Sequence, residues 1–377
     1  MQGVHSCAPP MSSRRTQTRR GGPGASRLSN HTLSRTVCAA DIVPQFNLST
    51  PFAAANGHTY RPQDLYSHWA GGDSDDRGGN GGEPFSRRST ASKAATVVTA
   101  ADGSHLGPLV CFLRAMASVE DVHLRVYNLG GLDAPKHMAL MRAAGSAFTL
   151  EQLEWPVLPA FAKPNHTRTT ESMRKGHYAW KVALIAAEVA RTANGECLVY
   201  LDAEVEPSAR LLSRFCTLAS ASGGMASPTS PGLLREWMHA GMPSWLERNV
   251  PSMHARATLA KSEQSCDAGM LAFIGGTTTA RWLASVWLGC AMVQSCIAPD
   301  GSSRGNHRQD QSALSLFVYA LQRAKADRIG ARCAGLCTSN DQQLLGQRKG
   351  QRRTGHKDSC RTNASLSSRL KTSTTYI

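Results

Sequence analysis

The sequence predicts an α/β protein with a mostly parallel central sheet and helices on both of its faces. Short apolar segments rich in β-branched residues alternate along the chain with longer amphipathic segments. The links between them are short, and such alternation is typical of parallel sheets covered by helices. Because the alternation is confined to residues 94–323 of the 377-residue chain, we expect a single domain there.

We expect this domain to lie between two disordered basic regions, residues 1–93 and 324–377. The net charge of +15 divides as +5 over residues 1–93, +1 over 94–322 and +9 over 323–377. Both flanks are polar and poor in aromatic residues, so neither can bury enough apolar surface to offset its ordering entropy. A Gly-rich, charged stretch at 73–88 is a plausible linker. Since the charge lies outside the foldable part, we expect solvated tails and no specific nucleic-acid partner.

No stretch of the sequence qualifies as a transmembrane segment. The longest uncharged run, Trp282–Pro299, contains polar residues and is shorter than the ~20 apolar residues that a bilayer needs, so we expect a buried helix there. The eleven cysteines form no CxxC pair, which argues against a zinc site; Cys290 and Cys296 could be a disulfide or two buried thiols. Sequons at Asn30, Asn47, Asn165 and Asn363 permit a secretory route. The localisation stays open at this point.

The first half of the predicted domain alternates strands and helices in order. The apolar or alternating patterns predict strands at Ala95–Thr99, Val122–Tyr127 and Phe148–Leu153, with helices at Leu106–Ser118 and Pro135–Ala144. The proline that opens the second helix suits the first helical position, where no backbone donor is needed.

A well-formed amphipathic helix and a buried strand follow. Tyr178–Arg191 carries Val182, Ile185 and Val189 at helical spacing. Cys197–Leu201 is a continuous apolar run, as in strands that are buried on both faces. Ligands of parallel sheets collect at the carboxyl ends of the strands, so we expect chemistry directly after this strand.

The first candidate residues are Asp202 and Glu204, which follow this buried strand. Two carboxylates two residues apart can present hard oxygen ligands to Mg²⁺ or Mn²⁺. Such an ion would neutralise a diphosphate leaving group and act as a Lewis acid. The alternative is that Asp202 begins the turn before Pro207 and that Glu204 faces solvent.

The second candidate segment, His307–Gln311, opens a predicted helix at Ser312–Leu321. His307 could be a further ligand of the same metal or a donor to phosphate. Arg308 beside a helix N-terminus suits an anion. Asp310 sits where an N-cap belongs, and capping alone would explain it.

Several segments, taken in order, resemble a family of largely uncharacterised eukaryotic proteins assigned to the nucleotide-diphospho-sugar transferase fold, the GT-A type of glycosyltransferase. The resemblance covers about residues 95–322 and rests on Tyr178–Lys181, Leu198–Asp202, Trp237–Met242, Asp267–Phe273, Cys296–Pro299 and His307–Leu314. In the third of these segments Ala240 replaces the family's proline. The fourth is similar to a strand near the acceptor site of several sugar transferases.

The resemblance implies a single GT-A-like, Rossmann-like domain and a role for each matching residue. Asp202 matches the first position of the metal-binding Asp-x-Asp signature, from which this sequence departs at Glu204. Asp310 and Gln311 match an Asp-Gln pair near the transferred sugar. The further roles implied are a phosphate or sugar contact at Lys181, a catalytic part for Asp267, and donor contacts at Thr99, Asp102, His239 and Arg308.

From these matches we expect a glycosyltransferase that uses a nucleotide-sugar donor. A divalent cation, Mn²⁺ or Mg²⁺, would be held by Asp202, Glu204 and His307, and the acceptor would be an unknown glycan, protein or lipid. The alternative is a non-catalytic scaffold or binding module that retains the fold, since a fold does not fix a function. The resemblance also suggests the Golgi or the secretory pathway.

Overall fold

The structure, a computed structural model, describes residues 51–70, 95–165, 170, 173, 175–259, 263–329 and 337–338. Eight strands form one sheet with the order β10-β7-β9-β6-β3-β4-β5, and β8 pairs with β7 off this path. The strands are β3 (Ala95–Ala101), β4 (Val122–Asn128), β5 (Thr149–Gln152), β6 (Cys197–Leu201), β7 (Met225–Leu233), β8 (Gln264–Cys266), β9 (Met270–Ile274) and β10 (Cys337–Thr338).

The half of the sheet that ends in the candidate residues is parallel. β6, β3, β4 and β5 pair in parallel, as does β10 with β7, whereas β9 runs antiparallel between β6 and β7. The prediction of an α/β fold with a mostly parallel central sheet is therefore confirmed. The parallel pairing brings the carboxyl ends of β3, β4 and β6 to the same edge.

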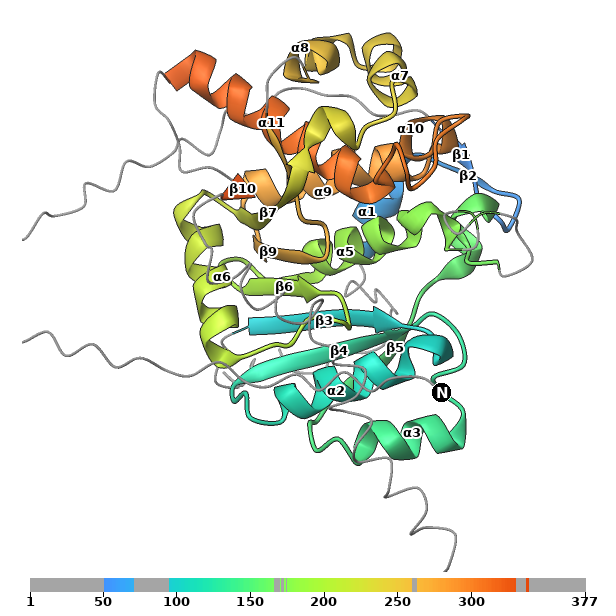
Figure 1. Ribbon diagram of the computed structural model, residues 1–377, viewed down its shortest axis with the longest axis vertical. Coiled ribbons are helices and arrows are strands. Elements are labelled where there is room, and N and C mark those ends of the chain that lie inside the picture. Colours follow the sequence, from blue (N-terminus) through green and yellow to red (C-terminus); the bar gives the residue numbers. More distant parts are fainter. Residues whose placement is uncertain are drawn as a thin grey trace, which may run out of the picture. The chain divides into compact units, whose positions relative to one another are not determined.

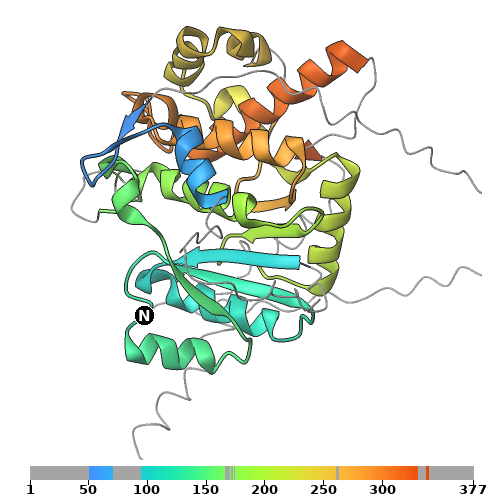
Figure 2. The same ribbon diagram turned by 180° about the vertical axis from the view of Figure 1, so that it is seen from behind.

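Helices cover both faces of the sheet. Figure 1 shows α2 (Leu106–Met116) and α3 (Pro135–Arg142) on one side and α5 (Ala179–Arg191) and α9 (Thr278–Ala291) on the other; Figure 2 shows the same layers from behind. Alternate strand residues supply the two cores. Val97 and Val199 belong to the apolar cluster that contains α2 and α6 (Ala209–Ala221), and Val98 and Tyr200 belong to the cluster that contains α5, α9 and α11 (Gln309–Ile329).

The domain extends beyond the boundaries that the sequence predicted. Residues 51–70 were expected to be disordered, but they form a hairpin, β1 (Phe52–Ala53) and β2 (Thr59–Tyr60), and the helix α1 (Pro62–Ala70). Leu65 and Trp69 are buried, and α1 contacts α5 and α9. Because the average composition of the first 93 residues is polar, it gives no sign of the few apolar side chains that pack against the domain. The linker at 73–88 and the sequons at Asn30, Asn47 and Asn363 lie outside the described residues.

The C-terminal boundary also moves. α11 continues to Ile329, and β10 adds a short strand beside β7, so elements of the domain lie beyond residue 323. The apolar run Trp282–Pro299 is not one helix, because α9 ends at Ala291 and a separate short helix, α10 (Gln294–Ile297), follows. A disulfide between Cys290 and Cys296 links the two, which settles the alternative left open for this pair.

Further connections complete the fold. A second disulfide joins Cys197 of β6 to Cys216 of α6. Along the chain, two helices, α7 (Gly241–Asn249) and α8 (Ala255–Leu259), connect β7 to β8. Asp267 was expected inside a strand, but it lies in the bend between β8 and β9. Over the described ranges, no helix combines the length and the apolar character needed to cross a membrane.

Candidate active site

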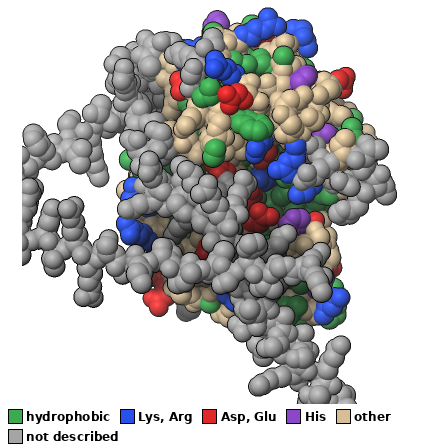
Figure 3. All heavy atoms as spheres, viewed as in Figure 1, with side chains coloured by type: hydrophobic (Ala, Val, Ile, Leu, Met, Phe, Trp, Pro, Cys, Tyr) green, Lys and Arg blue, Asp and Glu red, His purple; other side chains and the backbone are tan. Residues whose placement is uncertain are grey.

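The carboxyl edge of the parallel strands opens on a cavity of about 740 Å³. This volume lies within the range of small-molecule sites, roughly 300–1,000 Å³. The walls come from the ends of β3 and β6, the bend after β8, and the starts of α5 and α11. Figure 3 shows acidic, basic and histidine side chains next to one another in the middle of the face seen there.

The Lys181 ammonium group connects the two segments that the sequence singled out. Its Nζ lies 3.0 Å from Oδ1 of Asp202, at the end of β6, and 3.3 Å from Oδ2 of Asp310, in the first turn of α11. The Lys181 side chain is 7% exposed, against 30% for Asp202. Asp202 and Asp310 therefore line one cavity, as we expected, and a buried cation lies between them.

The charges in this cluster stabilise one another. Burial would lower the pKa of Lys181, but the charge of Asp202, followed by Tyr200 and Asp310, raises that pKa well above its ordinary value. Burial also raises the pKa of Asp310, which the Lys181 charge opposes. The Tyr200 hydroxyl donates a hydrogen bond of 3.0 Å to Oδ1 of Asp202. Lys181 is thus held as an ammonium between two carboxyl groups.

An unusual turn sets the start of α5 and with it the position of Lys181. Gly176, His177 and Tyr178 have φ values of +57°, +52° and +59°, in the left-handed region. Only glycine adopts this region without strain, and a Cβ atom on Gly176 would collide with the carbonyl group of Ala162. The three residues form a 3₁₀ turn that leads directly into the helix.

Tyr178, at the end of this turn, organises a cationic wall of the cavity. Its ring centroid lies 5.5 Å from Nζ of Lys181, 5.7 Å from Nζ of Lys175 and 5.8 Å from Cζ of Arg304. Nη1 of Arg304 also donates a hydrogen bond of 2.9 Å to the Tyr178 hydroxyl. Cations near an aromatic face are attracted by its quadrupole, so the ring holds three positive groups beside the cavity.

A second polar group stands where β3 ends. Asp102 accepts hydrogen bonds from the backbone N–H groups of Ser104 and His105, and its Oδ1 lies 2.8 Å from Nδ1 of His105. The hydrogen bond from His105 holds the pKa of Asp102 well below its usual range, and the same bond raises the pKa of His105. Glu204 also lines the cavity and has an exposed side chain, and its charge raises the pKa of His105.

The remaining wall combines an aromatic ring, an arginine and a buried carboxyl group. The guanidinium carbon of Arg308 lies 4.1 Å from the ring centroid of Trp237, so the two groups stack. Asp267 is 2% exposed, and its Oδ1 accepts a hydrogen bond of 2.8 Å from the N–H of Gly269. Gln311 lines the cavity beside Asp310. The polar groups of this wall can hydrogen-bond to a sugar.

Three residues that were predicted from the sequence to belong to the site lie elsewhere. His307 is fully buried: its Nε2 donates to the carbonyl of Ile297 at 2.9 Å, and its Nδ1 accepts from the N–H of His239 at 3.3 Å. Burial lowers its pKa to about 4, so the ring is neutral and fixes a loop. His239 does not line the cavity, and its Nδ1 accepts from the N–H of Gly241. Thr99 is completely buried inside β3.

The three side chains that were predicted to bind a divalent cation do not all line the cavity. Of the three predicted metal ligands, Asp202 and Glu204 line the cavity but His307 does not. Asp202 is already paired with Lys181, and the described residues contain no group of three His, Cys, Asp or Glu side chains that could hold a metal ion. The predicted set of three metal ligands is therefore not assembled, although Asp202 and Glu204 share the cavity.

Several residues of the cavity were not predicted from the sequence. Tyr200 had a usable signal, because residues two apart on a strand face the same side and Tyr200 precedes Asp202 by two. Trp237 and Tyr178 stand within matched segments but were given no role. Arg304 lies in a loop whose path the sequence does not indicate.

No protein-family model matches the sequence, and no curated protein matches it. Among solved structures, the chain is similar to the galactosyltransferase LgtC in complex with donor and acceptor sugar analogs, at 16% identity over 59% of this chain and 69% of that chain, with a TM-score of 0.36. It is also similar to core-mannan synthase A from Aspergillus fumigatus in an Mn/GDP form, at 10% identity over 67% and 75% of the two chains, with a TM-score of 0.35. A third similar structure is glucosyl-3-phosphoglycerate synthase from Mycobacterium tuberculosis with phosphoglyceric acid, at 12% identity over 72% and 85%, with a TM-score of 0.30.

Because each TM-score lies below 0.5, we draw no conclusion about function from these likenesses.

Proposed function

We propose that the chain is a glycosyltransferase that moves a sugar from a nucleotide-diphospho-sugar donor to a glycan, protein or lipid acceptor. One observation carries this proposal: a buried ammonium group, Lys181, joins two carboxyl groups at the carboxyl edge of a parallel sheet, in a cavity of suitable size. Sites of α/β proteins lie at this edge. The arrangement offers positive charge for a diphosphate and acceptor oxygens for sugar hydroxyls in one space.

The lining residues divide into three groups that match the parts of such a donor. The loop after β3, with Asp102, is suited to the nucleoside. The basic side chains of Lys175, Arg304 and Arg308, which line the cavity, are suited to the diphosphate. Asp267, Asp310 and Gln311 offer hydrogen bonds to the sugar.

Transfer breaks the bond between the anomeric carbon and the phosphate oxygen, and the electron pair leaves with the diphosphate. A new bond forms from the acceptor oxygen to the anomeric carbon, and the proton of the acceptor hydroxyl leaves to water. The chain's residues would contribute by holding the two substrates in line and by stabilising the charge that develops on the leaving group. We include no divalent ion in this scheme, because His307, one of its three predicted ligands, does not line the cavity.

Asp310→Asn tests the proposal in the full chain. Release of UDP from UDP-sugars, or of GDP from GDP-sugars, is measured for the wild type and the variant. We expect the variant to lose about 10²- to 10³-fold in rate, the size of effect seen when one preorganised polar group is removed from an active site. Asp133→Asn, an exposed carboxylate outside the cavity, is the matched control and should react like the wild type.

Three results separate the proposal from its rival. Equal rates in the wild type and the Asp310 variant would remove Asp310 from the mechanism. Donor binding without any release of nucleotide would favour a non-catalytic binding module with the same fold. If no nucleotide sugar binds at all, the glycosyltransferase proposal is wrong.

We further propose that the chain works in an oxidising compartment, such as the secretory pathway with the Golgi. Two disulfides within the described residues support this, because structural disulfides persist in oxidising compartments and are rare in the cytosol. Asn165, which begins a sequon, has an exposed side chain.

A further inference from the structure

We propose that Lys181 is the built-in cation of this site, so that the donor's diphosphate binds without a divalent metal ion. The inference rests on the proposed function and specifies which charge meets the diphosphate. It is drawn from the disagreement between the metal ligands that the sequence predicted and the side chains that line the cavity.

The first support is the position of the ammonium group. Nζ of Lys181 lies between the carboxylates of Asp202 and Asp310, at 3.0 and 3.3 Å, where β6 ends and α11 begins. The rings of Tyr178 and Tyr200 flank it, with their centroids 5.5 and 5.6 Å away. The group is therefore fixed from four sides, and it needs no reorganisation to meet an anion.

The second support is the donor capacity of this group. An ammonium carries three N–H donors, and the two carboxylates account for two of them. Lys181 lines the cavity, so a third N–H can serve a ligand there. A phosphate oxygen is a suitable acceptor, because hydrogen bonds between charged partners are shorter and stronger than neutral ones.

The third support is that a divalent ion would have to compete with this cation. Oδ1 of Asp202 already takes the Lys181 ammonium and the Tyr200 hydroxyl. A metal ion bound to the same carboxyl group would stand a few ångströms from a fixed positive charge, and like charges repel at that range. His307 cannot compensate, because both of its ring nitrogens contact the backbone.

The fourth support is the positive charge of the surrounding wall. Lys175, Arg304 and Arg308 line the same cavity as Lys181. Arg304 and Lys175 are held by the ring of Tyr178, and Arg308 by that of Trp237. Together these side chains can match the charge of a diphosphate, which is the task that a divalent ion performs in a metal-dependent site.

In the transfer reaction Lys181 would donate a hydrogen bond and keep its proton. The bond between the anomeric carbon and the phosphate oxygen breaks, and its electron pair stays on the diphosphate, next to the ammonium. The acceptor oxygen forms the new bond, and its proton leaves to water. No oxidant, reductant or further reactant is needed.

Calorimetric titration of the full chain with UDP and with GDP tests the inference. Each titration is run twice, once with excess EDTA and once with saturating Mn²⁺. For the wild type we expect the same dissociation constant in both, within about two-fold. Lys181→Met should weaken binding in EDTA by about 10- to 100-fold, as for a lost hydrogen bond to a charged group.

Two further variants separate the effect of the Lys181 charge from other effects of substitution. Lys181→Arg retains the charge and should bind within about ten-fold of the wild type. Lys136→Met, which removes an exposed lysine of α3 outside the cavity, is the matched control and should bind like the wild type. Should Lys181→Met fail to fold, as seen by circular dichroism, the comparison of EDTA with Mn²⁺ in the wild type still decides the matter.

The outcomes separate the inference from the proposed function. Wild-type binding that appears only with Mn²⁺ overturns the inference and leaves the glycosyltransferase proposal standing. Equal binding by the wild type and a folded Lys181→Met also overturns the inference. Absence of binding by UDP, GDP and their sugars under both conditions contradicts the proposed function itself.

Discussion

Burying a charged side chain is costly unless partners replace the water that it loses. Lys181 meets this condition through Asp202 and Asp310, and His307 meets it differently, by staying neutral. The two residues show why a polar residue near a cavity need not serve the ligand. The charged Lys181 side chain lines the cavity, whereas both ring nitrogens of His307 form hydrogen bonds with the backbone.

The buried His307 gives the protein a defined pH dependence of stability. Its pKa is about 4 in the folded chain and near 6.5 when unfolded, so the unfolded state binds more protons between these values. The contribution of His307 to the free energy of unfolding is fully present above pH 6.5. It decreases by about 3 kcal/mol as the pH falls from 6.5 towards 4. The measurement is urea unfolding at several pH values.

The comparison with His307→Gln isolates this contribution from those of other groups. The amide can replace one or both contacts but does not titrate, so the variant should lose less stability than the wild type between pH 6.5 and 4. Asp310, whose pKa burial raises, acts in the opposite direction and is common to both chains. His58→Gln, at an exposed position, should follow the wild type. Parallel curves for the wild type and His307→Gln would contradict the assignment.

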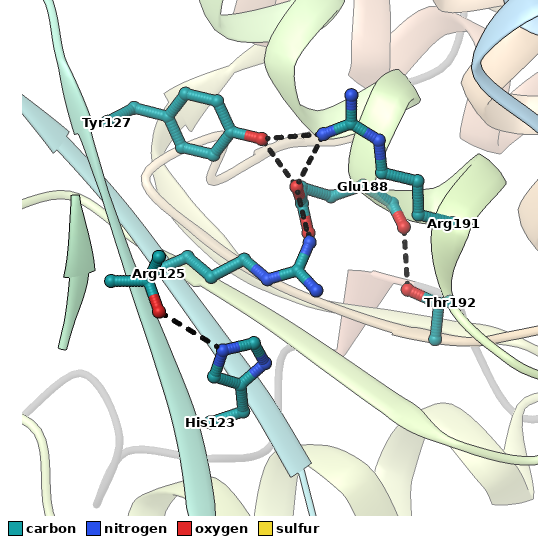
Figure 4. Close-up of polar contacts among 7 residues, drawn as sticks. His123, Arg125, Tyr127, Glu188, Arg191 and Thr192 are labelled. Atoms are coloured by element: carbon teal, nitrogen blue, oxygen red, sulfur yellow. Dashed lines mark hydrogen bonds and ion pairs between the residues drawn. The ribbon is translucent and has the colours of Figure 1, made fainter. Parts of the chain in front are cut away.

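At the scale of the elements, α5 carries the site at its beginning and is anchored at its end. Figure 4 shows Arg125 and Tyr127 of β4, together with Arg191 of α5, pointing at the carboxylate of Glu188. Glu188 is 1% exposed, and Nη1 of Arg125 lies 3.0 Å from Oε2 of Glu188. The cluster fixes the helix against the sheet, and the left-handed turn at the other end then determines where Lys181 stands.

This turn predicts a specific cost for Gly176→Ala. The new Cβ atom would meet the backbone of Ala162, and alanine in the left-handed region adds strain, so we expect a loss of at least about 2 kcal/mol in the free energy of unfolding. Gly195→Ala is the control, since its φ of +82° is similar but its Cβ would meet nothing within 4 Å. It should lose only about 1 kcal/mol. Equal losses in the two variants, measured by denaturant unfolding, would show that the contact with Ala162 is unimportant.

At the scale of the whole molecule, disulfides join elements on both faces of the sheet. Cys197–Cys216 ties β6 to α6, and Cys290–Cys296 ties α9 to α10, whereas Cys266 is a buried free thiol. The strand that precedes Asp202 is thus cross-linked to a helix on the face opposite α5. Such cross-links are typical of oxidising compartments, in agreement with the compartment proposed above.

Thiol labelling of the chain isolated from eukaryotic cells checks the compartment. Free thiols are alkylated in denaturant before reduction, and newly exposed thiols are alkylated with a second reagent afterwards. We expect the second label on Cys197, Cys216, Cys290 and Cys296. Cys266 is the internal control and should carry the first label. The first label on all five cysteines would contradict an oxidising compartment.

Much of the fold could be predicted from the sequence because the signals are local. The strand Cys197–Leu201 and the helices near 106–118 and 178–191 follow from apolar periodicity, and their order implies a parallel sheet. The hairpin and helix at 51–70 were missed, because their few apolar anchors are diluted in a polar region. The strand β10 is two residues long and shows no pattern of its own.

The candidate site was predictable only in part. That Asp202 and Asp310 share a cavity follows from the rule that strand ends gather at one edge of the sheet. The bridge by Lys181 depends on a turn of three residues with positive φ, which the sequence marks only at Gly176. The direction of the His307 ring depends on its contacts with the backbone of Ile297 and of His239. These residues lie in other segments of the chain, and no sequence pattern indicates that they meet His307.

The central claim is that this cavity binds a nucleoside diphosphate at Lys181, and a crystal structure of the full chain soaked with UDP tests it most directly. We predict a diphosphate within about 3 Å of Nζ of Lys181, the length of a hydrogen bond, and close to the guanidinium group of Arg308. UDP bound at another surface, or a diphosphate that lies in the cavity but away from Lys181, would contradict the claim.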